Sequence, residues 1–279
     1  MSATVSVEVP SGKDKGDENF PVGSLLIRRA LRPHVHAFYA FARQADDVAD
    51  SATLTADEKI ARLDRMEAVL LGRAPDAGAP SAARLRGSLA ETGVTARHSQ
   101  DLLAAFRQDA TKRRYASWAE LLDYCRFSAM PVGRHVLDLH GEAPATYAPS
   151  DPLCAALQVV NHLQDLALDL AHLDRCYVPL DLLDAAGARV EDLAGPALTS
   201  ALRRVVDAVL DETDTLNRAG AALPGVVRDR RLRTECAVIS GLARRLAARL
   251  RREDPLAGRV KLGRGDVAGS VLRALGWLA

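Results

Sequence analysis

A mostly apolar stretch at residues 153–170 carries a row of polar side chains with helical spacing. The row consists of Gln158, Asn161, Asp165 and Asp169, at positions i, i+3, i+7 and i+11. This spacing places all four side chains on one face of an α-helix. Because the other faces are apolar, the pattern predicts a buried helix. Two carboxylates one turn apart in a core need a partner, and a divalent cation is the simplest one.

The same arrangement occurs earlier, in a second mostly apolar stretch at residues 34–51. Its polar row is Tyr39, Arg43, Asp46 and Asp50, at positions i, i+4, i+7 and i+11, with Asp47 beside it. If the two rows face each other across a bundle, they define a cavity that has acids at one end. Mg²⁺ prefers oxygen ligands and commonly binds substrate phosphates, so the pattern favours a magnesium site for a diphosphate substrate.

The remaining periodicity predicts an all-α chain, since no alternating run is convincing as a strand. We expect roughly eight to ten helices in one bundle. Outside the two helices with polar rows, the pattern indicates helices near residues 56–71, 81–92, 96–110, 118–139, 197–221, 226–252 and up to about 277, with short helices before residue 31 and after residue 179.

Polar residues and prolines predict where several of these helices begin or bend. Capping pairs lie at Thr55 with Glu58 and at Ser117 with Glu120, and single N-caps are expected at Thr95 and Ser150. Pro33 suits the first turn of the first acidic helix. Pro131 and Gly133 interrupt the helix over residues 118–139, so we expect a kink there.

Composition limits the class of protein. The chain has 279 residues, of which 48% are hydrophobic and 26% charged, and its net charge is +1. This composition is globular and gives no support for a nucleic-acid partner. Residues 1–18 are polar and are expected to form a disordered tail, followed by one domain at residues 19–279. Charges interrupt every long apolar run and the first residues lack a signal-peptide pattern, so we expect a cytoplasmic location, with peripheral membrane contact left open.

Several common active-site chemistries lack their motifs. The four cysteines form no CxxC pair and predict free, mostly buried thiols in a reducing compartment. The sequence contains no HExxH, GxxxxGK[ST], GxGxxG or GxSxG motif. Zinc hydrolysis, P-loop chemistry, a Rossmann cofactor and a serine nucleophile therefore have no support.

Further side chains are candidates for contacts to a diphosphate. Arg43 lies one turn before Asp46, which favours bidentate binding of phosphate oxygens. For Arg175, that role and a surface ion pair are more evenly matched. Tyr124 and Tyr177 are as readily packing residues as substrate contacts.

The other notable side chains receive simpler interpretations. His162 and His172 flank the second acid pair and are interpreted as satisfied helical histidines, not as metal ligands. Phe20 with Pro21 indicates an ordered entry segment over the cavity mouth.

Three longer stretches resemble the squalene/phytoene synthase family of head-to-head prenyl synthases. They are YAFARQADDVAD at 39–50, YCRFSAMPVG at 124–133 and NHLQDLALD at 161–169, the last followed by DRCYVP. The likeness covers nearly all of residues 18–279. The segments ENFPVGSLL, RPHVHAFYAFAR, SAMPVGR and QVVNHLQD look most like the hydroxysqualene synthase branch of bacterial hopanoid biosynthesis.

This resemblance implies an isoprenoid (terpenoid) synthase fold, a single helical bundle around a central active-site cavity. It implies Mg²⁺ as the cofactor, with Mn²⁺ as a substitute, and no NAD(P)H. The implied catalytic residues are Asp46, Asp50, Asp165, Asp169 and Tyr124. The implied metal contacts are Asp46, Asp47, Asp50, Asn161, Asp165 and Asp169. The implied substrate contacts are Phe20, Tyr39, Arg43, Gln158, Asn161, Gln164, Arg175 and Tyr177.

The sequence departs from phytoene and dehydrosqualene synthases in two places. Those enzymes usually have arginine directly before the second acid motif, where this chain has Gln164. The family's Ala-Gly before Val-Gly is replaced by Met130-Pro131. Both departures favour the hydroxysqualene branch, although Leu166-Ala167-Leu168 makes the second motif more apolar than we expect of that branch.

The function implied is conversion of presqualene diphosphate to hydroxysqualene, with loss of diphosphate and capture of water. Head-to-head condensation of farnesyl or another prenyl diphosphate, to presqualene diphosphate, squalene or phytoene, is the alternative. A third interpretation is an inactive family member that acts in complex assembly, but all motif acids are intact. Other enzymes of the pathway are the partners expected beside the substrate.

Overall fold

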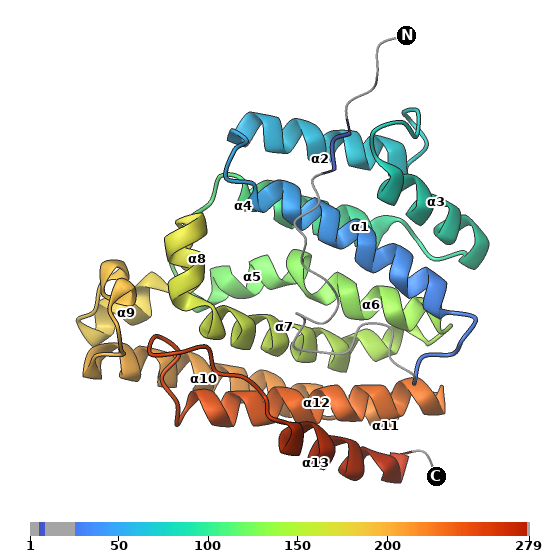
Figure 1. Cartoon of the computed structure of the whole chain (residues 1–279). Coiled ribbons are helices and arrows are strands. Elements are labelled where there is room, and N and C mark those ends of the chain that lie inside the picture. The colour runs from blue at the N-terminus through green and yellow to red at the C-terminus, as the bar shows by residue number, and fades with distance from the viewer. Residues whose placement is uncertain (1–5, 9–25, 278–279) are drawn as a thin grey trace.

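The computed structural model describes residues 6–8 and 26–277, and all regular structure within these ranges is helical (Figure 1). It contains thirteen α-helices and three short 3₁₀ turns. A β-bridge between Arg114 and Cys176 is the sole strand-like pairing in the described ranges. The predicted all-α class is therefore confirmed. Phe20 lies outside the described residues, as do residues 1–5 and 9–18 of the predicted tail.

The helices follow one another with short connections. The first half contains α1 (Arg32–Asp50), α2 (Ala56–Leu70), α3 (Pro80–Thr92), α4 (Arg97–Asp109), α5 (Trp118–Ser128), α6 (Met130–Leu139), η1 (Pro144–Thr146) and α7 (Tyr147–Gln164). The second half contains α8 (Leu166–Leu173), α9 (Leu180–Ala186), η2 (Val190–Ala194), α10 (Ser200–Gly220), α11 (Leu223–Val226), α12 (Arg230–Leu250), α13 (Arg264–Ala274) and η3 (Leu275–Trp277).

Local capping signals place most helix starts correctly. Thr55 and Glu58 form the predicted capping box of α2, and the Ser117 hydroxyl accepts the Glu120 N–H at the start of α5. The prediction for Thr95 is wrong by one residue, because Ala96 is the N-cap of α4. The Thr95 hydroxyl nevertheless accepts the Arg97 N–H at 3.2 Å.

The predicted start of α7 at Ser150 is wrong, because the helix begins at Tyr147. The 3₁₀ turn η1 leads directly into α7, and Thr146 is the N-cap. Pro149 lies in the first turn of α7, where a missing N–H removes no helical hydrogen bond. A proline-rich entry that looked like a loop is therefore helical.

The structure has more helices than the eight to ten predicted, partly because two predicted helices are each divided into two. The helix over residues 118–139 breaks at Ala129, just before Pro131 enters the first turn of α6. The predicted helix over residues 153–170 breaks at Asp165, which has φ −107° and ψ 16°. The Asp165 N–H still donates to Asn161 O, and the Asp169 N–H donates to Asp165 O, so two helix-type hydrogen bonds persist across the break.

The helices form layers that run through the molecule from α2 at one edge to α13 at the other (Figure 1). Helix α1 packs on α2, α3 and α4, and α4 packs on α5 and α6. Helix α7 lies between this half and the pair α10 and α12, because it contacts α5 and α6 as well as α10 and α12. Helix α13 packs on the outer side of α12. Among the described helices, none combines the length and the apolar character that crossing a bilayer requires.

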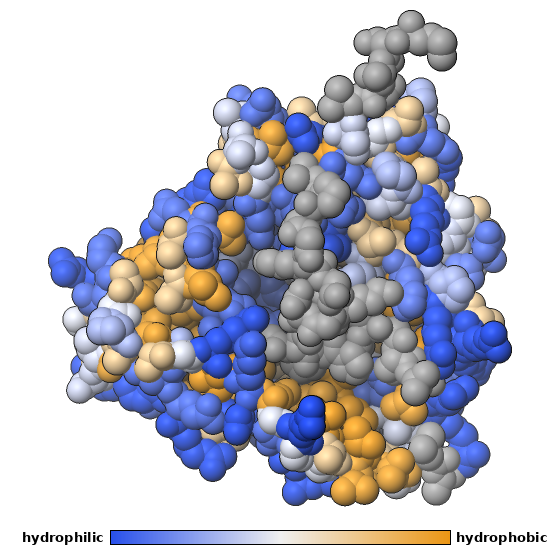
Figure 2. Space-filling model, viewed as in Figure 1, coloured by the Kyte–Doolittle hydropathy of each residue, from blue (hydrophilic) through white to orange (hydrophobic). Residues whose placement is uncertain are grey.

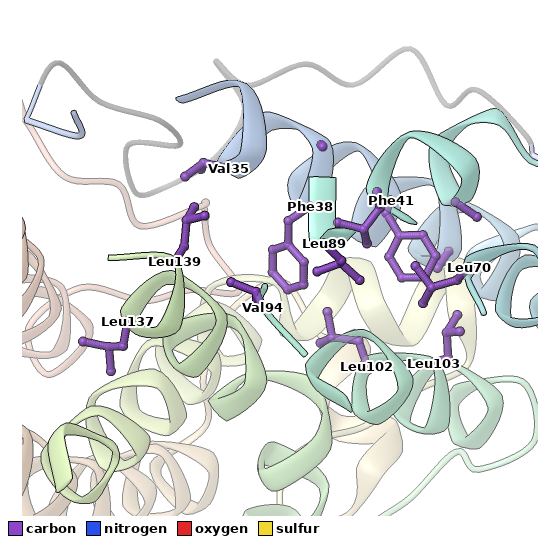
Figure 3. Close-up of a cluster of buried hydrophobic side chains, with 14 of the residues drawn as sticks. Val35, Phe38, Phe41, Leu70, Leu89, Val94, Leu102, Leu103, Leu137 and Leu139 are labelled. Carbon is purple, nitrogen blue, oxygen red and sulfur yellow. The ribbon is translucent and has the colours of Figure 1, made fainter. Parts of the chain in front are cut away.

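Two clusters of buried side chains hold these layers together. The first surrounds α1, where Phe38 and Phe41 pack with side chains of α3, α4 and α6 (Figure 3). The second surrounds α7, where Val159 and Leu163 pack with side chains of α10 and α12. Phe38 and Phe41 are buried in the first cluster, and Phe127 packs against the second cluster as a partly buried side chain.

Residues 6–8 fall within the segment predicted to be disordered and lie against the start of α3. The Val7 N–H donates to Gly78 O at 2.8 Å. The Glu8 carboxylate accepts the Ser81 N–H at 2.7 Å and the Ser81 hydroxyl at 2.6 Å. This short segment thus caps α3, whose N-cap residue Ala79 has no side-chain acceptor.

Gly220 marks the closest approach between α10 and α7, and this contact gives a stability prediction. A Cβ atom at residue 220 would lie 2.9 Å from Leu153 Cβ and 3.1 Å from its backbone N and Cα. We expect Gly220→Ala to lower the free energy of unfolding by about 1–3 kcal/mol, because the two helices must separate. Urea unfolding measures this change. Gly225→Ala is the control, since nothing lies within 4 Å of its added Cβ; equal stability of both variants would contradict the prediction.

Candidate functional site

Helix α1 is continuous through the first acid motif, so Tyr39, Arg43, Asp46 and Asp50 share one face. Arg43 joins two of the acids, with Nη1 3.0 Å from Asp46 Oδ2 and Nη2 2.8 Å from Asp47 Oδ1. Asp47 is buried, while Arg43 and Asp46 are partly exposed. One guanidinium therefore holds two neighbouring carboxylates in fixed positions.

Arg175 connects the loop after α8 to the end of α1. Its Nη1 donates to Asp50 Oδ1 at 2.6 Å, and its Nη2 donates to Ala49 O at 3.1 Å and Asp109 O at 2.9 Å. The side chain is buried. Arg175 is thus buried beside the first acid motif and pairs with one of its acids. This excludes the alternative that Arg175 forms a surface ion pair.

Asp109, at the end of α4, lies at the centre of a buried polar group. Its carboxylate accepts the Tyr124 hydroxyl at 2.8 Å and the Tyr177 hydroxyl at 3.4 Å. Burial raises the pKa of Asp109 to about 6, although Arg175 and the Tyr124 hydrogen bond oppose this shift. The two tyrosines that were open to either interpretation are therefore both directed at one acid beside the first motif.

The charged form of Asp46 is disfavoured by its surroundings in the first motif. Burial raises the pKa of Asp46 well above its ordinary value, the Asp50 carboxylate raises it further, and Arg43 opposes the shift. Asp47 Oδ2 is buried and has no hydrogen-bond partner among the described residues. Carboxylate oxygens are the donors that Mg²⁺ prefers, so the chemistry of these side chains, with the unpartnered Asp47 oxygen among them, is compatible with the metal that the sequence predicts.

The second acid motif is held by an arginine from the loop before α13. Arg259 Nε lies 2.9 Å from Asp165 Oδ1, and Nη2 donates to Asp165 Oδ2 at 3.0 Å. Burial raises the pKa of Asp165 and Asp169 adds to this effect, while Arg259 lowers it. This pair holds the carboxylate at the point where α7 bends into α8.

His162 lies between the two acid groups. Its ring stacks on Tyr177, with the centroids 3.6 Å apart, and its Nδ1 is 3.8 Å from Asp169 Oδ2. Interaction with His162 lowers the pKa of both Asp109 and Asp165, so the ring is close to acids of both halves. The sequence predicted a helical histidine with a hydrogen-bond partner, and Gln158 Nε2 lies 3.1 Å from His162 Nε2. The sequence did not predict that His162 lies between the two acid groups.

The acids are paired with arginines and are not gathered around one point. In the described part of the chain, no three His, Cys, Asp or Glu side chains are close enough together to hold a metal ion. Arg43, Arg175 and Arg259 each contact a motif acid directly. The metal contacts assigned to Asp46, Asp47, Asp50, Asn161, Asp165 and Asp169 therefore stay a prediction.

A cavity of about 340 Å³ lies between α1, α6, α7 and α12. Its walls are mostly apolar, and Tyr39, Ser150 and Glu235 supply polar atoms. The wall residues Ala42 on α1 and Leu157 on α7 each stand one helical turn before a polar residue of the acid rows. Those residues are Asp46 and Asn161. Both helices therefore carry an apolar wall that continues, on the same face, into their polar rows.

Gln164 is placed differently from the other predicted substrate contacts. It is buried, and its Nε2 donates to Val260 O in the loop that also carries Arg259. Its amide thus holds this loop against the end of α7. Among the predicted substrate contacts, Phe20 lies outside the described residues.

Three residues near the acids were missed from the sequence: Lys59, Asp109 and Arg259. Lys59 and Asp109 could have been recognised from the sequence, because each is a charged residue on the buried face of its amphipathic helix. Burial lowers the pKa of Lys59, as do Arg175 and Arg113, while Asp50 and Asp109 raise it. Arg259 lies in a loop and carried no comparable signal.

The arrangement can be compared with known proteins. The squalene/phytoene synthase family description matches residues 13–266. The chain belongs to this family. It is 48% identical over 259 residues to hydroxysqualene synthase from Rhodopseudomonas palustris, covering 93% of this chain and 88% of the relative.

Solved structures agree with the family and the fold. Squalene synthase HpnC from Alicyclobacillus acidocaldarius matches with a TM-score of 0.73 and 34% identity, covering 83% of this chain and 87% of that one. A dehydrosqualene synthase matches with a TM-score of 0.81 over 95% of this chain and 93% of that one. Its 19% identity shows the fold alone. The predicted isoprenoid synthase fold is thereby confirmed.

The pKa of Asp109 gives a pH prediction for the metal-free protein. Since its pKa is about 6 in the folded chain against an ordinary 3.8, the folded state binds the proton more tightly. The contribution of Asp109 to the free energy of unfolding is therefore fully present below about pH 4. It falls by about 3 kcal/mol as the pH rises through 6. Urea unfolding in EDTA should show a fall that is about 3 kcal/mol smaller for Asp109→Asn than for the parent chain, because Asp46 and Asp165, whose pKa values are also raised, remain in the variant. Asp184→Asn, on the exposed surface of α9, is the control; parallel curves for parent and Asp109→Asn would contradict the assignment.

Proposed function

We propose that this chain converts presqualene diphosphate to hydroxysqualene, releasing diphosphate and adding water. The observation that carries this proposal is an apolar cavity whose walls on α1 and α7 both continue into rows of acids. Such a site suits a molecule with a long hydrocarbon part and one anionic end. The similarity to a hydroxysqualene synthase over 93% of the chain supports this choice of reaction.

Cationic side chains of the site bind the anionic end in this proposal. Arg43, Arg175 and Lys59 surround the first acid motif, and Arg259 lies at the second. Guanidinium groups bind phosphate oxygens through two parallel hydrogen bonds. Mg²⁺ bound by the motif acids Asp46, Asp50, Asp165 and Asp169 would supply further positive charge beside the departing diphosphate.

The apolar wall protects the cation formed when the diphosphate leaves with its bonding electron pair. Side chains such as Phe38, Leu153 and Leu157 line the cavity and offer no nucleophile. Rearrangement can then precede capture, in which a water oxygen forms the new C–O bond and loses a proton. Tyr124 lies beside the acids, and its hydroxyl donates to Asp109. We assign Tyr124 to positioning groups at the diphosphate end of the cavity.

A squalene synthase type of reaction is the second candidate. It is favoured by the 34% identity to squalene synthase HpnC from Alicyclobacillus acidocaldarius. The two candidates differ in substrate and product, so a product analysis separates them.

The purified chain, incubated with presqualene diphosphate and Mg²⁺ without NADPH, is expected to form hydroxysqualene. Gas chromatography with mass spectrometry identifies the product, and a parallel incubation with farnesyl diphosphate tests head-to-head condensation. Release of diphosphate should stop when EDTA is present. Formation of squalene or phytoene in place of hydroxysqualene would overturn the proposed reaction, and binding without turnover would favour an inactive family member.

Single acid substitutions test the role of the two motifs. Asp50→Asn and Asp165→Asn are each expected to lower kcat/KM by about 100-fold or more, because charge stabilisation of the leaving group is lost. Circular dichroism checks that the variants keep their helix content. The exposed control Asp184→Asn should keep full activity. Activity within about threefold of the parent for both motif variants would remove these acids from the reaction.

A further inference from the structure

Exposed apolar side chains concentrate on the C-terminal helix. Among the described residues, most of the large apolar side chains that are exposed lie on α13 and η3. They are Val267, Val271, Leu272, Leu275 and Trp277, with Leu272 exposed to 68%. Figure 2 shows apolar surface gathered at the lower edge of the molecule, where Figure 1 places α13. A contiguous patch of this kind on a protein surface usually marks an interaction site.

Helix α13 has two faces with different surroundings. Ser270 and Ala274 are buried against α12, where a Cβ at Gly241 would lie 3.1 Å from the Ser270 hydroxyl. Val267 and Val271 flank these buried positions and are 43% and 39% exposed, and Leu272, farther round the helix, is 68% exposed. The helix is therefore fixed to the domain by one face and leaves an apolar face uncovered by any described residue.

A basic pocket of about 300 Å³ adjoins this face, between α11, α12 and α13. Its charged and polar lining consists of Arg244, Arg245, Arg273, Ser240 and Ser270, with Trp277 at its edge. No acidic side chain is among the described residues that line it. The pocket therefore offers positive charge and hydrogen-bond donors next to an apolar surface.

The donors in the pocket are only partly used within the protein. The Ser270 hydroxyl is buried and has no hydrogen-bond partner among the described residues. Arg273 makes no hydrogen bond or ion pair in the described part of the chain. Arg244 donates to the Ser240 hydroxyl at 3.2 Å. Three guanidinium groups with a spare hydroxyl match the oxygens of a phosphate group.

Asp266 is the acid nearest to this group, and it does not neutralise it. It lies 3.4 Å from Arg245 Nη1 and 3.2 Å from Arg249 Nε, and Arg249 also lies 3.6 Å from Glu253, so Asp266 pairs with one of the three pocket arginines. Arg244 and Arg273 have no acidic partner among the described residues. The net charge of the pocket is therefore positive, although the whole chain has a net charge of only +1.

We propose that α13 and η3 dock on an anionic phospholipid membrane, with a lipid phosphate in the pocket of Arg244, Arg245 and Arg273. The apolar face then enters the boundary between headgroups and acyl chains, where tryptophan is also favoured. Basic residues beside the apolar face are attracted to the negative surface potential of such a membrane. A second copy of the chain fits less well, because a self-complementary contact would bring like-charged arginines together. This proposal does not depend on the proposed reaction.

Sedimentation of the full chain with vesicles tests the proposal. We expect binding to phosphatidylcholine vesicles that contain 30% phosphatidylglycerol, and at least tenfold weaker binding to phosphatidylcholine alone. The double variant Arg244→Gln/Arg273→Gln should lose about tenfold or more of the affinity for anionic vesicles. Leu272→Ser should weaken binding by removing an inserted side chain. Thermal unfolding checks that each variant is folded.

Matched variants elsewhere on the surface serve as controls. Arg84→Gln lies on an exposed position of α3, and Leu168→Ser replaces a side chain of α8 that is 49% exposed. Both should bind anionic vesicles like the parent chain. Loss of binding in these controls equal to that in the α13 variants would overturn the assignment of the surface.

Two further outcomes would also overturn it. If inorganic phosphate at millimolar concentration binds through the same arginines while the chain ignores anionic vesicles, the pocket is a site for a soluble anion. If the chain ignores vesicles and Leu272→Ser converts a dimer to a monomer in analytical ultracentrifugation, the apolar face is a contact between copies of the chain.

Discussion

The ion pair between Arg175 and Asp50 joins two parts of the chain that are far apart in sequence, and the polar site depends on it. Arg175 is buried and also donates to backbone oxygens at the ends of α1 and α4. A buried guanidinium needs every such acceptor, because an unpaired charge in the core is strongly destabilising. The loop after α8 is therefore fixed against the first acid motif, which also places Tyr177 beside Asp109.

Around this pair, the site contains more acids than its surroundings can easily keep charged. The pKa values of Asp46, Asp109 and Asp165 are all raised, with burial as the largest cause. Arg43, Arg175 and Arg259 offset part of this cost by pairing with acids of the two motifs. Carboxylates in such a site are stabilised by any further positive charge bound beside them, because an opposite charge lowers a raised pKa.

The sequence predicts those residues of the site that recur with the spacing of an α-helix. The two polar rows on apolar helices identify α1 and α7 and the acids on them, and Lys59 and Asp109 follow the same rule on α2 and α4. Tertiary placement of loops does not follow from periodicity, so the contact of Arg259 with Asp165 was invisible. The start of α7 at Tyr147 was also missed, because prolines beside it allow both a loop and a helix. The break at Asp165 was missed because no proline or glycine lies near it in the sequence.

The bend at Asp165 shows why the second motif differs from the first. Along α1 the helix is continuous, so its acids keep one fixed spacing. At Asp165 the backbone departs from helical angles, and Arg259 and Gln164 tie this point to the loop before α13. The position of Asp165 is thus set by a connection that also leads to α13. A change in how α13 sits on α12 would therefore reach the second motif through this loop, whereas the first motif is held independently by Arg43 and Arg175.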